Sequence, residues 1–492
     1  MKKLILLFSF LNAFCVGAQG IDNLWRMGYA SYFGDPQYGG IDMNFLSGSL
    51  LISHPQRKMN YGDNSATICD SLGQLLFSTN GFYIENALGD TMVNGSGLNP
   101  SYYTAGASES GFYIPQASLI IPFPGNSNKY FLIHSTIDDS IAYSYKTYYT
   151  LIDMTLDGGL GAVVSKNNLL NIGVFIAGRI TGVKHANGRD WWVVVHEGNS
   201  NNYLIYLIDQ YGIHFFATQS IGAVQISDKG QFCFSPDGTK FAQYSPTNDL
   251  DIMDFDRCGG MFSNVVHVPI NDSAGGGGVA FSPNSNVLYV SSTSYLYQFD
   301  LLSSNIPLSK TTVAIWDTTY SPNPPFATTF YLSQLAPDGK IYISTTNSTI
   351  DIHVIDYPDS LGFACQVCQH CVHLQAYDAF TIPNMPSYHL GSLPGSICDT
   401  LTSSIAAISV GVEGFSIFPN PAKDLVYLLN KSKSIPKSIL VENAIGELFQ
   451  VHMSFLNNGE YIEMNIENLK PGIYFIVIIQ DEKKRTLKMV KV

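Results

Sequence analysis

The stretch SPDGTKFAQYS, residues 235–245, decides the fold. Pro236 presets the backbone angle φ of a tight turn, Asp237 can accept hydrogen bonds within that turn, and Gly238 supplies the positive φ that sends the chain back. The residues after the turn alternate in character and include Phe241 and Tyr244, as in a half-buried strand. The stretch therefore predicts a hairpin that joins two strands.

Five further segments repeat this combination of a turn and an aromatic or β-branched strand. They are CDSLGQLLFSTNG from Cys69, PGNSNKYFLIHS from Pro124, HANGRDWWVVVHE from His185, SPNSNVLYVSS from Ser282 and APDGKIYIST from Ala336. The turn residues of all six, Gly73, Ser127, Gly188, Gly238, Ser285 and Gly339, are spaced by 54, 61, 50, 47 and 54 residues. This period is a little longer than a four-stranded propeller blade. Because one blade cannot bury its apolar faces alone, a closed ring is the stable arrangement.

The number of blades depends on the segments that lack a turn marker. Residues 26–55 and 365–390 read as strands, and joined they would make a seventh blade built from both ends of the ring. We therefore predict an all-β fold with a seven-bladed β-propeller at residues 19–390. In a six-bladed alternative, these two segments would form a lid.

Residues 1–18 read as a secretory signal peptide. Two lysines precede an apolar run from Leu4 to Val16, which is too short to span a bilayer, and small residues end at Ala18. We expect cleavage before Gln19 and no membrane-spanning segment in the mature protein. The formal net charge of -13 disfavours a nucleic-acid partner, since phosphate binding needs a clustered basic face. We predict no cofactor and no metal site.

The character of the chain changes after the predicted propeller. Residues 391–413 are small, polar and weakly patterned, which indicates a linker. Residues 414–492 contain several short strand patterns and carry 10 Lys and Arg against 8 Asp and Glu, whereas the rest of the mature chain carries 14 basic against 31 acidic residues. The two parts therefore differ in charge, and residues 414–492 form a second domain.

Four motifs mark this second domain: FPNPAKDLVYL at 418–428, NAIGELF at 443–449, LKPGIYFI at 469–476 and the terminal KMVKV. In order and spacing they resemble the C-terminal sorting domain of the bacterial type IX (Por) secretion system. The residues that carry the signal are Phe418, Pro419, Asn420, Pro421, Gly446, Gly472, Tyr474, Lys488 and Lys491. The resemblance implies a small β-sandwich that the outer-membrane translocon recognises after export through the periplasm. It also implies a protein that is released or attached to the cell surface.

Blocks within residues 26–401 resemble the WD-repeat-like propellers of surface proteins exported by that system. Among them are ICDSLGQLLFSTNG, AFSPNSNVLYVSS and IPNMPSYHLG. Because that family has no settled activity, the likeness bears on architecture. We expect a non-catalytic binding or adhesion module with a glycan or protein ligand on loops around the central channel. The alternative is a secreted hydrolase or lyase acting on polysaccharide or peptide, which acids or histidines converging on the channel mouth would favour.

Candidate catalytic residues are few. His185, Asp190, His196 and Glu197 share one segment, but the first two flank a predicted turn and the other two end the following strand. Structural roles are therefore expected, and no residue is assigned to catalysis.

Two further stretches have both a functional and a structural interpretation. The glycines at 275–278 lack the Lys and the helix of a phosphate-binding loop, so they indicate a flexible connection. Trp191 and Trp192 could line a glycan platform, but aromatic residues on propeller strands mostly pack in the core.

Seven cysteines remain after removal of the signal peptide, so at least one thiol is free. The run CQVCQHCVH, residues 365–373, has a metal-ligand spacing, but an oxidising export route favours disulfides. Candidate disulfide residues are Cys69, Cys258, Cys365 and Cys398. A Cys365–Cys398 bridge would fasten the start of the linker to the ring, although the sequence does not fix the connectivity.

Overall fold

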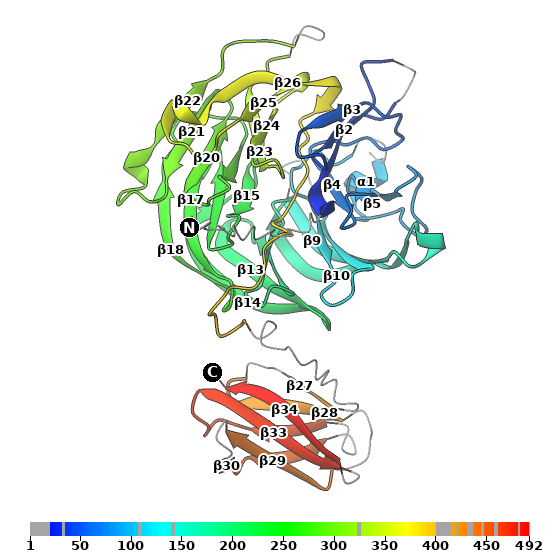
Figure 1. The fold of residues 1–492 in the computed structure, drawn as a ribbon, viewed down its shortest axis with the longest axis vertical. Helices are drawn as coiled ribbons and strands as arrows, with labels where there is room; N and C mark the ends of the chain where they lie inside the picture. Colours follow the sequence, from blue (N-terminus) through cyan, green and yellow to red (C-terminus); the bar gives the residue numbers. More distant parts are fainter. Residues whose placement is uncertain are drawn as a thin grey trace, which may run out of the picture. The chain divides into compact units, whose positions relative to one another are not determined.

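The computed structural model describes most of the chain after the predicted signal peptide, which lies outside the described residues. The described ranges are 20–31, 35–106, 111–138, 143–321, 326–399, 415–418, 422–430, 436–443, 447–456, 461–480 and 483–491. The chain divides into two compact units, residues 1–402 and 403–492 (Figure 1).

The first unit is a β-propeller, whose described residues form seven antiparallel sheets that follow one another along the chain. Blades 1 and 2 have three strands each: β1 (Leu24–Gly28), β2 (Gly40–Asn44), β3 (Leu51–Ser53); and β4 (Ala66–Cys69), β5 (Leu75–Thr79), β6 (Ile84–Asn86). Blades 3 and 4 have four each: β7 (Ser118–Pro122), β8 (Lys129–Ser135), β9 (Tyr143–Asp153), β10 (Ala162–Ile176); and β11 (Thr181–Lys184), β12 (Trp191–His196), β13 (Ser200–Asp209), β14 (Gly212–Gln225). Blades 5 and 6 are β15 (Gln231–Phe234), β16 (Lys240–Ser245), β17 (Asp249–Asp256), β18 (Met261–Val268); and β19 (Gly277–Phe281), β20 (Val287–Ser292), β21 (Tyr295–Asp300), β22 (Thr311–Ile315). Blade 7 is β23 (Phe330–Leu335), β24 (Ile341–Thr345), β25 (Ser348–Ile355) and β26 (Val367–Ala379). A short helix, α1 (Tyr102–Gly106), follows blade 2.

The six sequence markers all lie in the turn between the first and second strands of blades 2–7. Gly238 has φ +73° and Gly339 has φ +80°, as the turn chemistry predicts. The acidic side chain closes each turn: Asp237 Oδ1 accepts from Thr239 N at 2.9 Å, and Asp338 Oδ1 accepts from Lys340 N at 3.1 Å. The repeat analysis therefore identified these six blades correctly.

The first strands of neighbouring blades pack along the middle of the ring, for example β15 against β19 and β19 against β23. Blade 7 meets blade 1 where Gly28 N donates to Asp378 Oδ1 at 3.2 Å and Tyr377 N donates to Gln37 O at 2.9 Å. The predicted blade with strands from both ends of the ring is wrong, because β26 pairs with β25 and β1–β3 form their own sheet. A meander of consecutive strands needs only short connections, which favours this local pairing.

The second unit is a β-sandwich, as the resemblance implied. Its described strands form two four-stranded sheets, in the orders β27-β28-β32-β31 and β30-β29-β33-β34. Their bounds are β27 (Phe415–Phe418), β28 (Leu425–Asn430), β29 (Ser438–Asn443), β30 (Leu448–Phe449), β31 (His452–Leu456), β32 (Tyr461–Asn465), β33 (Gly472–Gln480) and β34 (Lys483–Lys491). Alternate residues of the strands, such as Val426, Ile462 and Ile476, pack together in one core.

Candidate functional site

The channel of the propeller is filled by the chain itself. After β26, residues 381–388 pass along the first strands of the blades, and in Figure 1 this gold trace crosses the middle of the ring. Asn384 holds the segment in place: its N donates to Ser65 O at 2.9 Å, and its Nδ2 donates to Ser118 O at 3.0 Å and Ile180 O at 2.8 Å. The side chain of Asn384 thus bonds to blades 3 and 4, and its backbone N–H bonds to blade 2.

Other contacts tie this channel segment, residues 381–388, to further blades. Gln334 Nε2 of blade 7 donates to Met385 O at 3.4 Å, the Ser387 hydroxyl donates to Pro236 O of blade 5 at 3.3 Å, and the Tyr388 hydroxyl donates to Ile120 O of blade 3 at 2.8 Å. Every residue of the segment except Ser387 is buried. The ligand site expected around the channel is therefore restricted to its two ends.

At the end formed by the blade-to-blade connections, here called the loop end, charged groups converge. Lys229 Nζ lies 3.2 Å from Asp63 Oδ2, and Arg179 forms an ion pair with Asp228. Asp63 and Arg179 are buried, so desolvation raises the pKa of Asp63 to about 6 and lowers that of Arg179 to about 10.

The loop-end groups are largely committed to structure. Asp228 Oδ2 accepts from the Ser245 hydroxyl at 2.5 Å and from Thr247 N at 3.0 Å. In the described part of the chain, Arg179 Nε and Nη1 are buried without a hydrogen-bond partner, and Arg179 has φ +54°. Such atoms commonly bind ordered water.

At the other end, here called the turn end, the channel opens into a cavity of about 410 Å³. It is lined by the turns of blades 5, 6 and 7, by residues 385–387 and 389–391, and by Asp22 and Trp25 near the N-terminal end of the ring. Its walls are mainly proline rings and apolar side chains. This turn-end cavity has the size and lining of a small ligand site.

The cavity has one charged pair on its rim. His389 Nε2 donates to Asp22 Oδ1 at 2.8 Å, and this hydrogen bond raises the pKa of His389. The thiol of Cys233 also lines the cavity, but burial raises its pKa to about 12, so it is not a nucleophile at neutral pH. These groups can orient a ligand, but they do not form an acid–base or nucleophile–base pair for hydrolysis.

The candidate catalytic residues are not brought together. His185 and Asp190 flank the turn before β12, with His185 N donating to Asp190 O at 2.8 Å. His196 ends β12, roughly 20 Å along the strand from Asp190 at about 3.3 Å per residue. Glu197 Oε2 accepts from Asn202 Nδ2 at 2.6 Å. The four residues therefore have local structural roles, and burial lowers the pKa of His196 to about 3.

The tryptophans and the glycine run also have structural explanations. Trp191 and Trp192 are buried in the core and cannot form a glycan platform. Gly277 and Gly278 lie in β19, where a Cβ would approach Ser291 O to 2.1 Å and Gln231 Oε1 to 2.3 Å. The expected flexible connection is therefore limited to the first two glycines, because the other two let strands pack closely.

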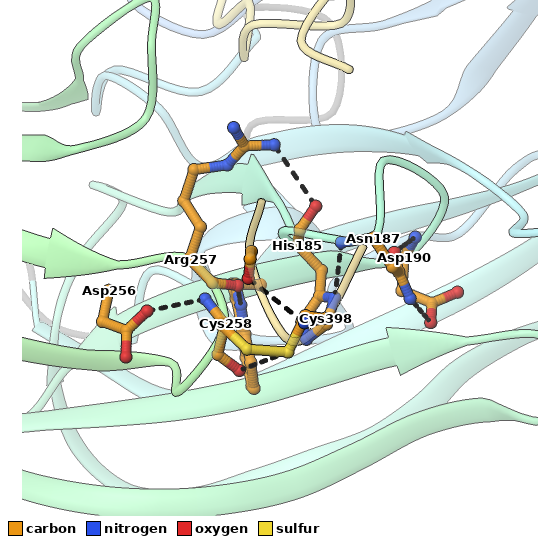
Figure 2. The surroundings of a disulfide bond; sticks show 9 residues. His185, Asn187, Asp190, Asp256, Arg257, Cys258 and Cys398 are labelled. Carbon is orange, nitrogen blue, oxygen red and sulfur yellow. Dashed lines mark hydrogen bonds between the residues drawn. A yellow bond between two sulfur atoms is a disulfide. The ribbon is translucent and has the colours of Figure 1, made fainter. Parts of the chain in front are cut away.

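One disulfide fastens the chain where it leaves the ring. Cys398 is bonded to Cys258 in the turn between β17 and β18, with Cα atoms 5.7 Å apart (Figure 2). The neighbouring Arg257 donates to Gly391 O, and Leu393 N donates to Ala186 O at 2.8 Å. Residues 391–399, expected as the start of a linker, therefore pack on blades 4 and 5.

The suggested Cys365–Cys398 bridge is not formed. Cys365 is a buried free thiol in the core between blades 6 and 7, whereas Cys398 lies on blade 5. Cys69 is also a buried free thiol. The fastening role that the sequence suggested is therefore carried out by Cys258.

The CQVCQHCVH run contains a second, local disulfide, between Cys368 and Cys371 in β26. Its histidines pair with carboxylates: His370 Nε2 lies 3.0 Å from Asp317 Oδ1, and His373 Nδ1 lies 2.9 Å from Asp351 Oδ1. In the residues that the structure describes, no three His, Cys, Asp or Glu side chains are grouped to hold a metal ion.

The sorting-signal residues occupy several environments in the sandwich. Tyr474 is buried against Phe449, with its hydroxyl donating to Lys470 O at 2.9 Å, and Lys491 is buried near Asp424. Gly472 begins β33 and Lys488 is exposed in β34. Phe418 ends β27, while Pro419, Asn420, Pro421 and Gly446 lie outside the described residues.

A scan against protein families matches residues 416–492 to the secretion system C-terminal sorting domain. A search of curated proteins found no match. Among solved structures, a protein from Lactobacillus plantarum is 11% identical, with a TM-score of 0.44, over 74% of this chain and 98% of its own. The Myceliophteria thermophila Cps50 (Swd1) β-propeller domain is 10% identical, with a TM-score of 0.39, over 67% and 91%. A Xanthomonas campestris protein described as a gluconolactonase is 10% identical, with a TM-score of 0.31, over 66% and 85%.

The sheet order and the family match define a β-propeller protein with a C-terminal sorting sandwich. The chain is a cargo of the Por secretion system, because residues 416–492 match the C-terminal sorting domain of that system. Such a domain directs translocation across the outer membrane, so the protein is secreted or attached to the cell surface. No helix in the described ranges is long and apolar enough to cross a membrane.

Proposed function

We propose that the propeller is a non-catalytic binding or adhesion module, which the sorting domain delivers to the cell exterior. The observation that carries this proposal is the filled channel. Because residues 381–388 occupy it, polar groups from several blades cannot converge on a substrate inside the ring. A ligand binds at an end of the ring instead.

The alternative, a hydrolase or lyase, is favoured by one observation at the loop end. A carboxyl group with a pKa of about 6, such as Asp63, can exchange a proton near neutral pH. Its complete burial and its ion pair with Lys229 argue against direct contact with a polymer. We therefore rank binding above catalysis.

We also propose that the sorting-motif residues, from Phe418 to Lys491, contribute to recognition in two ways. Tyr474 and Lys491 are buried and support the sandwich, whereas Gly472 and Lys488 are exposed on its surface. This division is consistent with recognition of a folded domain rather than of a linear peptide.

Glycan and peptide arrays probed with the full mature chain test the proposal, together with assays for product release from the ligands that bind. The expected result is saturable binding without turnover. Turnover that is abolished in Asp63→Asn, with binding retained, would establish the enzymatic alternative. An absence of binding to both arrays would contradict the proposed function.

A further inference from the structure

The turn-end cavity has a wall that is repeated three times. Blades 5, 6 and 7 each contribute the last apolar residue of the first strand and a proline two positions later, in the sequences FSP at 234–236, FSP at 281–283 and LAP at 335–337. Trp25 and the residues Met385, Pro386 and Leu390 of the exiting chain supply further apolar surface. The turns that form the blades therefore also form a flat-sided apolar pocket.

The pocket exists because the chain leaves the channel on one side. Leu393 N bonds to Ala186 O of blade 4, and a Cβ on Gly238 of blade 5 would lie 2.8 Å from Leu390 Cδ2. The exiting chain thus covers blade 4 and contacts the Gly238 side of blade 5. The wall formed by blades 5–7 is left facing the cavity.

Most polar side chains around the cavity are already hydrogen-bonded. Gln334 Nε2 donates to Leu335 O at 3.1 Å, Ser387 donates to Pro236 O, Cys233 donates to Phe234 O at 3.2 Å, and His389 pairs with Asp22. A sugar bound here would lose water from its hydroxyl groups and find few partners in return, which costs free energy. The lining therefore favours an apolar group over a glycan.

The charge of the rim favours a positively charged partner. Asp22 lines the cavity, and Asp237 and Asp338 directly follow two of its prolines. Asp237 is exposed, and Asp338 is half-buried. Arg257 and Lys340 are the cations nearest to them, but within the described part of the chain neither cation comes within 4 Å of either carboxylate, and Lys340 pairs with Asp356 instead. His389 is the basic group in the lining, and it is paired with Asp22.

We propose that the turn-end cavity binds an aliphatic or aromatic side chain of an extended peptide that carries lysine or arginine beside it. The apolar side chain enters between the three prolines, and the flanking cations lie near Asp237 and Asp338. This inference rests on the proposed binding function and names the site and the ligand class for it.

The test measures binding of three synthetic peptides to the full mature chain by titration calorimetry. They have the central sequences Lys-Leu-Lys, Lys-Ser-Lys and Glu-Leu-Glu in the same glycine flanks. We expect the first peptide to bind at least about tenfold more tightly than either of the others, because each control removes one of the two recognised features. Raising the salt concentration weakens only the charge contribution.

Two matched glycine variants test the location. Gly391 lines the cavity and Gly275 lies at the loop end, and a Cβ added at either meets no atom within 4 Å. Gly391→Trp should weaken binding of the Lys-Leu-Lys peptide at least about tenfold, whereas Gly275→Trp should leave it unchanged. Thermal melting of both variants confirms that the ring is intact.

Equal affinity of the three peptides, or full binding by Gly391→Trp, overturns the inference. If ligands from the arrays bind and Gly391→Trp does not weaken their binding, the proposed function stands and only this site is wrong. If Gly391→Trp abolishes the binding of a glycan, the location of the site is correct but the proposed ligand class is wrong. Failure of the whole array removes the proposed function itself.

Discussion

Asp378 is a buried carboxylic acid at the junction between blades 7 and 1, where its Oδ1 accepts from Gly28 N. Burial raises the pKa of Asp378 to about 8, so the folded protein holds a proton that the unfolded chain releases near pH 4. Stability from this proton is fully present below about pH 4 and is lost as the pH rises through 8. The Asp63 carboxyl contributes in the same sense, but only up to about pH 6.

Asp378→Asn should therefore remove one source of pH dependence while retaining the acceptor for Gly28. Between pH 6 and 8, the free energy of unfolding of the protein should fall relative to that of the variant by about 1 kcal/mol per pH unit. Urea unfolding at pH 6, 7 and 8 measures this difference. The buried, neutral His134, His196 and His353 contribute an opposite trend at lower pH, which is the same in both proteins. Parallel pH curves for the two proteins would contradict the raised pKa of Asp378.

The Cys258–Cys398 disulfide should stabilise the propeller by closing a long loop. It spans 140 residues, whereas the Cys368–Cys371 disulfide spans 3. Since the loss of unfolded-chain entropy grows with loop length, Cys398→Ser should lower the free energy of unfolding by about 2–4 kcal/mol. The double variant Cys368→Ser, Cys371→Ser is the control and should cost much less. Equal costs in denaturant titrations would show that closing the long loop is not the source of the stability.

At the scale of elements, the turns are where the sequence was most informative. Pro, Asp or Asn, and Gly act on adjacent residues, so their effect is readable without any knowledge of distant contacts. Blade 1 lacks the marker, because β1 ends at Gly28 and β2 begins only at Gly40, so no tight turn joins them. Without that marker, the sequence analysis wrongly assigned this segment to one blade together with the C-terminal strands. The channel segment belongs to the IPNMPSYHLG block, and the sequence does not predict where this block lies in the ring. Asn384 bonds to residues more than 200 positions away, and a single sequence does not reveal such contacts.

For the candidate site, too, the sequence shows the local turn residues but not the contacts between distant segments. The cavity wall contains three copies of an apolar residue followed two positions later by a proline, and these copies are visible in the sequence repeats. Turn formation alone explains them, so the sequence does not predict a cavity. The connectivity of Cys398 was not deducible, since spacing in the chain does not fix which cysteines meet. The loop-end charges lie in unrelated connections, such as those of Asp63 and Arg179, and they have no common motif.

Two turn glycines provide a matched test of the element that decides the fold. Gly238 and Gly339 have almost the same positive φ, but an added Cβ at Gly238 would lie 2.7 Å from Arg257 Cδ, while one at Gly339 meets nothing within 4 Å. Gly339→Ala should cost about 1 kcal/mol of stability from backbone strain alone. Gly238→Ala should cost more, because Arg257 and Leu390 must also move. Denaturant unfolding of both variants checks the order, and a larger loss in Gly339→Ala would refute this account.

At the scale of the whole molecule, the proposed binding role and the delivery signal lie in different units. The propeller has its own core and its own long disulfide, so it does not need the sandwich in order to fold. The sandwich likewise has a separate core, built from residues such as Val426, Ile462 and Ile476. Removing one unit should therefore leave the structure of the other intact, which makes the route of export separable from the binding activity.

Deleting Phe418–Val492 should trap the protein in the periplasm, because the matched sorting domain is then lost. Fractionation of producing cells with an antibody against the propeller measures this, and resistance to limited proteolysis shows that the retained propeller is folded. Ile476→Asp is the companion variant: a charge in the sandwich core should unfold the domain and give the same retention. Lys488 is exposed, so Lys488→Ala should keep the domain folded. If this variant is nevertheless retained in the periplasm, the Lys488 side chain takes part in recognition by the translocon. Unchanged delivery to the surface after the deletion would show that another part of the chain directs export.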